Sequence, residues 1–343
     1  QWHRIMTTIR DVAELAGVSI ATISRVLNNK GKVSEETADR VRAIVKELDY
    51  VYVKQSLKPR RTEVKLQGLF AIILPTLSNP YFSELLDIVE QEVQYLGRSL
   101  LVYNSRGEMQ RELALLNICK QQKIDGLFIV PSSSKSEHIA LLNQQPFPVV
   151  SLTQLHPELT SVAVDHAEGG AQVAEHLTSM GHTQIGYLGP ADEAEQKFTG
   201  FRNKLSDLRI PLPVERIIDT PDVSAPELSA RFSAYLDQHA VLPFSAIFVF
   251  NDVSAQLVIE VLQSRGYRVP EDVLVVGFDN TLIAQVMNIS SVAQPIKEIG
   301  RLGFQEMMRL IEHNELGNDT HHLILSPRLV LRNSSVKLIK RVL

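Results

Sequence analysis

The amino-acid sequence predicts a small all-α head followed by an α/β core of two doubly wound, parallel-sheet lobes. The chain has 343 residues, which is more than one ordinary hydrophobic core accommodates. Its charge is divided: residues 1–65 carry 13 basic and 8 acidic side chains, whereas residues 66–343 carry 22 and 31. From Leu69 onward, short apolar runs such as Leu69–Leu74 alternate with amphipathic stretches such as Met109–Lys123, a pattern typical of parallel sheets covered by helices on both faces.

Residues 8–28 have the spacing of a helix-turn-helix. Thr8 is placed to cap a first helix, Gly17 can take the left-handed conformation that turns the chain, and Ser19 can cap a second helix. A third helix is expected at Glu35–Leu48, starting from the cap Ser34. The alternative is a plain helical hairpin, which the basic excess and the small or apolar residues at the template positions disfavour: Ala13, Gly17, Val18, Ile23 and Val26.

The second helix of such a unit enters the major groove of double-stranded DNA. Arg25 can make a bidentate contact with guanine. Ile20 and Ala21, at the tip of the helix, can contact thymine methyl groups. The remaining candidates suit phosphate contacts, with helix capping or plain solvation as the alternative, and are Thr8, Ser19, Thr22, Ser24 and Asn28.

Composition and motifs exclude several other classes of protein. The single Cys119 excludes a disulfide framework and a cysteine-rich zinc site, and we expect no metal and no cofactor. No apolar run is long enough to span a membrane and no export signal precedes Met6, so we expect a cytoplasmic protein. We expect no catalytic residues, because the chain has no glycine-rich phosphate loop, no nucleophile elbow and no zinc-protease motif.

Several motifs, in order along most of the chain, resemble those of the lactose/galactose repressor (LacI/GalR) family of bacterial transcriptional regulators. The head carries Ile9-Arg10-Asp11-Val12-Ala13 and Ala21-Thr22-Ile23-Ser24-Arg25-Val26-Leu27-Asn28. The core carries Ser78-Asn79-Pro80-Tyr81-Phe82, Val164-Asp165-His166, Gly169-Gly170, Gly277-Phe278-Asp279-Asn280, Gln294-Pro295 and Pro327-Arg328-Leu329.

The resemblance implies a core like that of periplasmic binding proteins, with two lobes joined by three crossovers. Residues 1–5 are then a tag remnant or an extended start, residues 6–49 the helix-turn-helix domain and residues 50–67 a hinge or linker. The effector-binding and dimerisation core is residues 68–343. We place one lobe at about 68–163 and 292–323, and the other at about 164–291 and 324–337.

The linker departs from the pattern of the family, whose hinge leucine wedges into the minor groove of DNA. Leu57 is the best candidate for that leucine, but Pro59 follows closely and would stop a helix. The alternative is a basic tether held near phosphates, which the five basic residues between Lys54 and Lys65 favour.

Candidate effector-binding residues follow the expected strands of both lobes, because ligands bind beyond the carboxyl ends of parallel strands. Asp279 can accept hydrogen bonds from two hydroxyl groups, and Asn251 offers a donor and an acceptor. Lys197 stands where the family has an arginine, and Thr153 where many relatives have an aspartate; both changes favour an acidic sugar such as an aldonate. The other candidates are Tyr81, Phe82, Phe250 and Gln294.

The resemblance also implies a homodimer that binds a pseudo-palindromic operator, and we predict a repressor of a carbohydrate-use operon. Its effector is expected to be a small sugar, sugar acid or sugar phosphate between the lobes. Two other interpretations stay open: a regulator that answers to a nucleoside or purine co-repressor, and a sugar-binding protein or sugar-processing enzyme without a regulatory role.

Overall fold

The computed structural model describes residues 15–18, 22, 23, 26, 33–47, 66–220, 225–313 and 320–336. The chain divides into two compact units, Gln1–Val64 and Lys65–Leu343. The division falls inside the basic segment that the sequence predicts as a linker. Leu57 lies outside the described residues. Among the described residues, no helix has the length and apolar character needed to cross a bilayer.

The described residues of the first unit form one small helical core. Gly17 has a φ of +63°, the left-handed conformation expected after the first helix. Helix α3 spans Glu35–Glu47, and the backbone N–H of Thr37 donates to Ser34 Oγ at 3.3 Å, which confirms the cap. The buried residues of this core are Ala16, Ile23, Val26, Ala38 and Val41.

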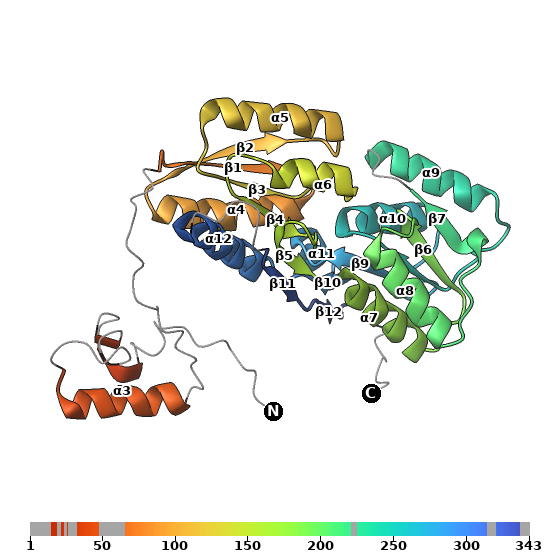
Figure 1. Cartoon of the computed structure of the whole chain (residues 1–343). Coiled ribbons are helices and arrows are strands. Elements are labelled where there is room, and N and C mark those ends of the chain that lie inside the picture. Colours follow the sequence, from red (N-terminus) through yellow and green to blue (C-terminus); the bar gives the residue numbers. More distant parts are fainter. Residues whose placement is uncertain are drawn as a thin grey trace. The chain divides into compact units, whose positions relative to one another are not determined.

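The first lobe of the second unit is a parallel sheet in the order β2-β1-β3-β4-β5-β11. Its strands are β1 (Leu69–Leu74), β2 (Ser99–Asn104), β3 (Gly126–Ile129), β4 (Val149–Thr153), β5 (Thr160–Val164) and β11 (His322–Leu325). Helices α4 (Pro80–Tyr95) and α12 (Ile296–His313) cover one face, and α5 (Met109–Gln122) and α6 (Ser136–Asn143) the other (Figure 1). Alternation along β1 explains both cores, since Phe70 and Ile72 pack in one and Ala71 and Ile73 in the other.

The second lobe has the strand order β12-β10-β9-β8-β6-β7. Its strands are β6 (Ile185–Gly189), β7 (Ile217–Asp219), β8 (Ala246–Val249), β9 (Leu274–Asp279), β10 (Ser290–Ala293) and β12 (Arg328–Val330). Helices α7 (His166–Ser179) and α8 (Gln196–Asp207) cover one face, and α9 (Ala225–Asp237) and α10 (Asp252–Ser264) the other. The short helix α11 (Leu282–Val286) follows β9, and a 3₁₀ turn η1 (Val214–Arg216) precedes β7. β12 runs antiparallel to β10, an exception to the all-parallel expectation.

The chain crosses between the two sheets three times, after β5, after β10 and after β11. Helix α12, which follows β10, packs beside α4 on the first sheet. The predicted class of two doubly wound lobes is therefore confirmed. The first crossover leads to the start of α7, and the second begins with the residues just after β10. Both points lie at the candidate effector-binding site.

Candidate effector-binding site

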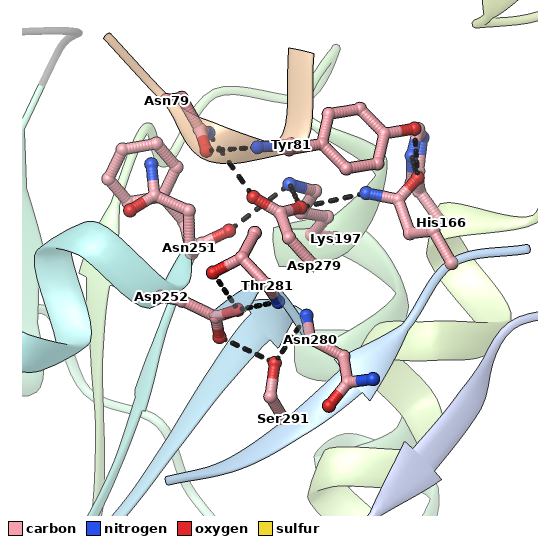
Figure 2. Close-up of polar contacts among 12 residues, drawn as sticks. Asn79, Tyr81, His166, Lys197, Asn251, Asp252, Asp279, Asn280, Thr281 and Ser291 are labelled. Atoms are coloured by element: carbon pink, nitrogen blue, oxygen red, sulfur yellow. Dashed lines mark hydrogen bonds and ion pairs between the residues drawn. The ribbon is translucent and has the colours of Figure 1, made fainter. Parts of the chain in front are cut away.

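Polar side chains from both lobes meet beyond the carboxyl ends of strands β1, β9 and β10 (Figure 2). Doubly wound sheets bind their ligands at this edge, so it is where an effector site is expected. We call this cluster the junction network; its members are Asn79, Tyr81, His166, Lys197, Asp279 and Gln294.

Asp279, the last residue of β9, is the centre of the junction network and is only 3% exposed. Asn79 Nδ2 donates to its Oδ2 at 3.3 Å, and Gln294 Nε2 donates to its Oδ1 at 2.7 Å. Lys197 Nζ lies 3.7 Å from the same Oδ1. Because Asn79 caps α4 in the first lobe, the carboxylate joins the two lobes directly.

Lys197, near the start of α8, points its ammonium group into the network (Figure 2). Its Nζ donates to the backbone oxygen of Phe250 at 3.1 Å and lies 4.3 Å from the centroid of the Phe278 ring. A carbonyl oxygen, the Asp279 carboxylate and an aromatic face therefore hold this cation. The side chain is 15% exposed.

A close crossing of α7 and α8 brings Lys197 to this position. A Cβ atom at Gly170 would lie 2.1 Å from the carbonyl oxygen of Lys197, and one at Gly200 would lie 2.0 Å from the carbonyl oxygen of Ala167. Such contacts are impossible between backbone and side-chain atoms, so both positions require glycine. A side chain at either glycine would push the helices apart and move the lysine.

Gln294, just after β10, forms the second connection between the lobes. Its Oε1 accepts a hydrogen bond from the Tyr81 hydroxyl at 2.9 Å and lies 3.1 Å from His166 Nε2. Tyr81, which donates to Gln294 Oε1, belongs to α4 of the first lobe. Asp279, which accepts from Gln294 Nε2, belongs to the second lobe.

A second carboxylate, that of Asp252 at the start of α10, lies behind the network and is fully buried. Thr281 donates to its Oδ2 from the backbone N–H at 2.7 Å and from the hydroxyl at 3.0 Å. The Ser291 hydroxyl donates to Oδ1 at 2.5 Å. These donors are neutral, and they fix the turn that follows Asp279.

Burial sets the protonation of the junction. It raises the pKa of Asp252 to about 7, with the charge of Asp279 adding to the effect. It also raises the pKa of Asp279, which Lys197 opposes, and that of Tyr81. Burial and then the charge of Lys197 lower the pKa of His166 to about 3. The imidazole is therefore neutral at physiological pH and carries one N–H.

The structure brings Tyr81, Lys197, Asp279 and Gln294 together, four of the residues that the sequence predicts as effector-binding. Phe250 contributes its backbone oxygen. The three remaining candidates are not joined to the network: Asn251 accepts from the Ser254 N–H and caps α10, Phe82 packs against the first lobe's core, and Thr153 ends β4 with a φ of +71°. Binding of an effector by any of them stays a prediction.

Sequence reasoning missed Asn79, His166 and Asp252 as members of the site. Asn79 and His166 stand in motifs quoted above, and Asp252 follows Asn251 directly, so a signal was present for each. What the sequence lacked was the pairing, because their partners lie up to 200 residues away in the chain. Of the predicted DNA-contacting residues only Thr22 is described, in helical conformation and half-buried; outside lie Thr8, Ser19, Ile20, Ala21, Ser24, Arg25 and Asn28.

A small helical unit and a two-lobed core in one chain are typical of DNA-binding regulators. Residues 8–52 match the model of bacterial regulatory proteins of the lacI family, and residues 174–335 match that of a periplasmic binding protein-like domain. The chain belongs to the lacI family of bacterial regulatory proteins and is a transcriptional regulator, not an enzyme.

Curated relatives match along nearly the whole chain. The HTH-type transcriptional regulator DegA of Bacillus subtilis is 31% identical over 341 residues, covering 96% of this chain and 98% of the relative. The ribose operon repressor of Halalkalibacterium halodurans is 31% identical and covers 96% and 97%. The transcriptional repressor PurR of Pectobacterium carotovorum is also 31% identical, over 96% and 97%.

Solved structures share the fold. The regulator CelR in complex with cellobiose has a TM-score of 0.68 at 23% identity, over 96% of this chain and 99% of that one. A LacI family regulator from Enterococcus faecium with bound ribose has a TM-score of 0.67 at 24% identity, over 79% and 99%. At these identities the likeness shows the fold alone.

Proposed function

We propose that this regulator is a repressor of a carbohydrate-use operon, and that a small neutral sugar binds at the junction network and changes its affinity for the operator. The observation that carries this proposal is the buried Asp279–Lys197 pair at the lobe junction, flanked by amide and hydroxyl groups. Carboxylate acceptors beside amide donors are what the hydroxyl groups of a sugar require.

Charge favours a neutral sugar over a sugar acid or a sugar phosphate. Lys197 is already matched by Asp279, and the carboxyl of Asp252 lies behind that pair. Glu84 of α4 is a third carboxyl near the pair: burial raises its pKa, and the charge of Asp279 raises it further. An anionic effector would meet more carboxyl groups than cations, so the acidic sugar favoured by the sequence is disfavoured by the site's surroundings.

The sugar must also replace contacts that already exist. The donors and acceptors of the junction network pair with one another. Two of these hydrogen bonds join the lobes, from Asn79 to Asp279 and from Tyr81 to Gln294. A sugar that takes Asp279 therefore breaks the contact between Asn79 and Asp279 unless it substitutes for it. Its differential affinity for the two arrangements of the lobes is the source of the change in operator affinity.

We further propose that the regulator acts as a homodimer in the cytoplasm on a palindromic operator. One helix-turn-helix per chain reads one half-site, so two copies are needed for a palindrome. Apolar side chains near the junction are candidates for the contact: Leu77, Leu282, Val286 and Met287 are 43%, 61%, 69% and 42% exposed. Sedimentation of the full chain tests this, and Val286→Glu should shift the species from two copies toward one.

The function is tested by selecting operator duplexes from a random library with the full chain, then adding sugars. A panel of neutral sugars, their aldonates, their phosphates and purines should show one neutral sugar that raises the melting temperature and changes operator affinity. Arg25→Ala should cost about 1–3 kcal/mol of binding and relax one base pair. A purine as the sole active compound would establish the co-repressor alternative, and turnover of a sugar without any effect on DNA binding would refute the proposal.

A further inference from the structure

We propose that His166 is a positioning residue that, through Gln294, connects the effector-binding carboxylate of Asp279 to two of the three crossovers between the lobes. The inference rests on the proposed function, since it assigns a regulatory connection within that same site. It concerns a residue that the sequence did not predict as part of the site.

The connection begins with where the two side chains stand in the fold. His166 is the first residue of α7 and follows the first crossover, after β5. Gln294 follows β10 directly and leads into the second crossover, toward α12. The contact of 3.1 Å between His166 Nε2 and Gln294 Oε1 therefore joins two crossovers that are 128 residues apart in sequence.

The direction of each hydrogen bond follows from the Asp279 carboxylate, which can only accept. Gln294 must present Nε2 to Asp279, at 2.7 Å, and this orientation leaves Oε1 to accept from the Tyr81 hydroxyl and from His166. His166 must then carry its proton on Nε2. Its neutral form has one N–H to give, and the network uses it.

The imidazole ring is fixed by packing as well. Its centroid lies 5.8 Å from that of the Phe278 ring, at 57°, and Phe278 also holds the Lys197 ammonium group. A sugar hydroxyl that donates to Asp279 Oδ1 competes with Gln294 Nε2 for that oxygen. The Gln294 amide must then change its orientation. Because its Oε1 is hydrogen-bonded to His166 Nε2, this change reaches the first crossover.

The test needs no ligand, because a change of charge at Asp279 can substitute for occupancy. We would record the Nε2–H signal of His166 by nitrogen-15 NMR of the full chain with labelled histidine, assigned by its loss in His166→Phe. Asp279→Asn should displace this signal in the wild-type background. In a Gln294→Met background, which keeps the side-chain volume but removes the amide, the same Asp279→Asn change should leave it in place.

The matched control is His182, whose Nδ1 pairs with Ser245 Oγ at 2.7 Å elsewhere in the same lobe; its signal should not respond. An unmoved His166 signal in Asp279→Asn would overturn the proposal. An equal displacement in the Gln294→Met background would also overturn it, because the coupling would then run through Lys197 and Phe278.

A second variant covers the case in which Gln294→Met does not fold. Tyr81→Phe removes the other donor to Gln294 Oε1, so His166 should become the main donor and its Nε2–H signal should move; an unmoved signal would contradict the shared acceptor. The sugar arm uses D-ribose and cellobiose, and a sugar that binds should displace the His166 signal only when Gln294 is present. Absence of binding by every sugar in the panel refutes the proposed function, whereas the ligand-free comparison still decides the connection.

Discussion

Two buried carboxylate centres of this chain have different surroundings. At the lobe junction, Asp279 is held by side chains from both lobes: Asn79 from the first, and Lys197 and Gln294 from the second and its crossover. Inside the first lobe, Glu112 of α5 is held within that lobe alone. Its Oε1 lies 2.5 Å from His138 Nε2 on α6, and its Oε2 accepts from the Ser132 N–H at 2.8 Å.

The difference separates a structural carboxylate from one whose partners can be exchanged. The donors to Glu112 belong to elements that move together with it, so its bonds last as long as the lobe is folded. The donors to Asp279 include a residue of the opposite lobe, so its bonds change whenever the lobes move. We expect substitutions at the first centre to affect stability and substitutions at the second to affect binding.

Glu112→Ala should give the largest effect. It leaves the His138 Nε2–H and the Ser132 N–H buried without an acceptor, since Glu112 is 0% and His138 2% exposed. Leaving two buried donors unpaired should lower the free energy of unfolding by about 2–6 kcal/mol, at about 1–3 kcal/mol for each. Urea unfolding of the full chain measures it, with the exposed Glu158→Ala as control. A loss of under about 1 kcal/mol would contradict a structural role.

Asp279→Asn should lower sugar affinity as well as stability. Removing the charge weakens hydrogen bonds to the sugar's hydroxyl groups and should reduce sugar affinity roughly 10- to 150-fold. The free energy of unfolding should fall by about 1–3 kcal/mol, because asparagine offers a single acceptor oxygen where Asn79 and Gln294 both donate to the carboxylate. Calorimetric titration with the active sugar measures the affinity, and the exposed Asp207→Asn is the matched control. Unchanged affinity would move the site away from Asp279.

The sequence predicted the elements better than the pairings. Runs such as Leu69–Leu74 and Met109–Lys123 coincide with β1 and α5 to within a residue, because side-chain periodicity is a local property. Short edge strands such as β7 and β12 were missed, since three residues carry too little pattern. At the site, its residue type at a strand end identified Asp279, whereas the resemblance to the family identified Lys197. The bonds of His166 to Gln294 and of Asp252 to Thr281 depend on how the crossovers and turns meet, which no local pattern specifies.

Asp252→Asn tests the junction through pH. Burial, and then the charge of Asp279, raise the pKa of Asp252 to about 7, against 3.8 when exposed. The native state therefore holds a proton that the unfolded state releases, and this stabilisation is complete below about pH 4 and is lost as the pH rises through 7. The variant lacks this loss, so its stability relative to wild type should rise between about pH 4 and 7, by at most about 1.4 kcal/mol per pH unit, and level off above pH 7. A constant difference across that range would contradict the raised pKa.

His156→Phe should show the opposite slope in the first lobe, with the smallest effect. His156 is 3% exposed and its Nε2 has no hydrogen-bond partner among the described residues. Burial, and then the charge of His138, lower its pKa to about 4 from 6.5. Its contribution to stability is complete above pH 6.5 and is lost as the pH falls through 4, because the unfolded state takes up the proton first. Phenylalanine keeps a ring in place without titrating. The free energy of unfolding of the variant should therefore rise relative to that of wild type as the pH falls from 6.5 to 4, while sugar affinity stays unchanged. A variant that becomes more stable relative to wild type as the pH rises would contradict the lowered pKa of His156.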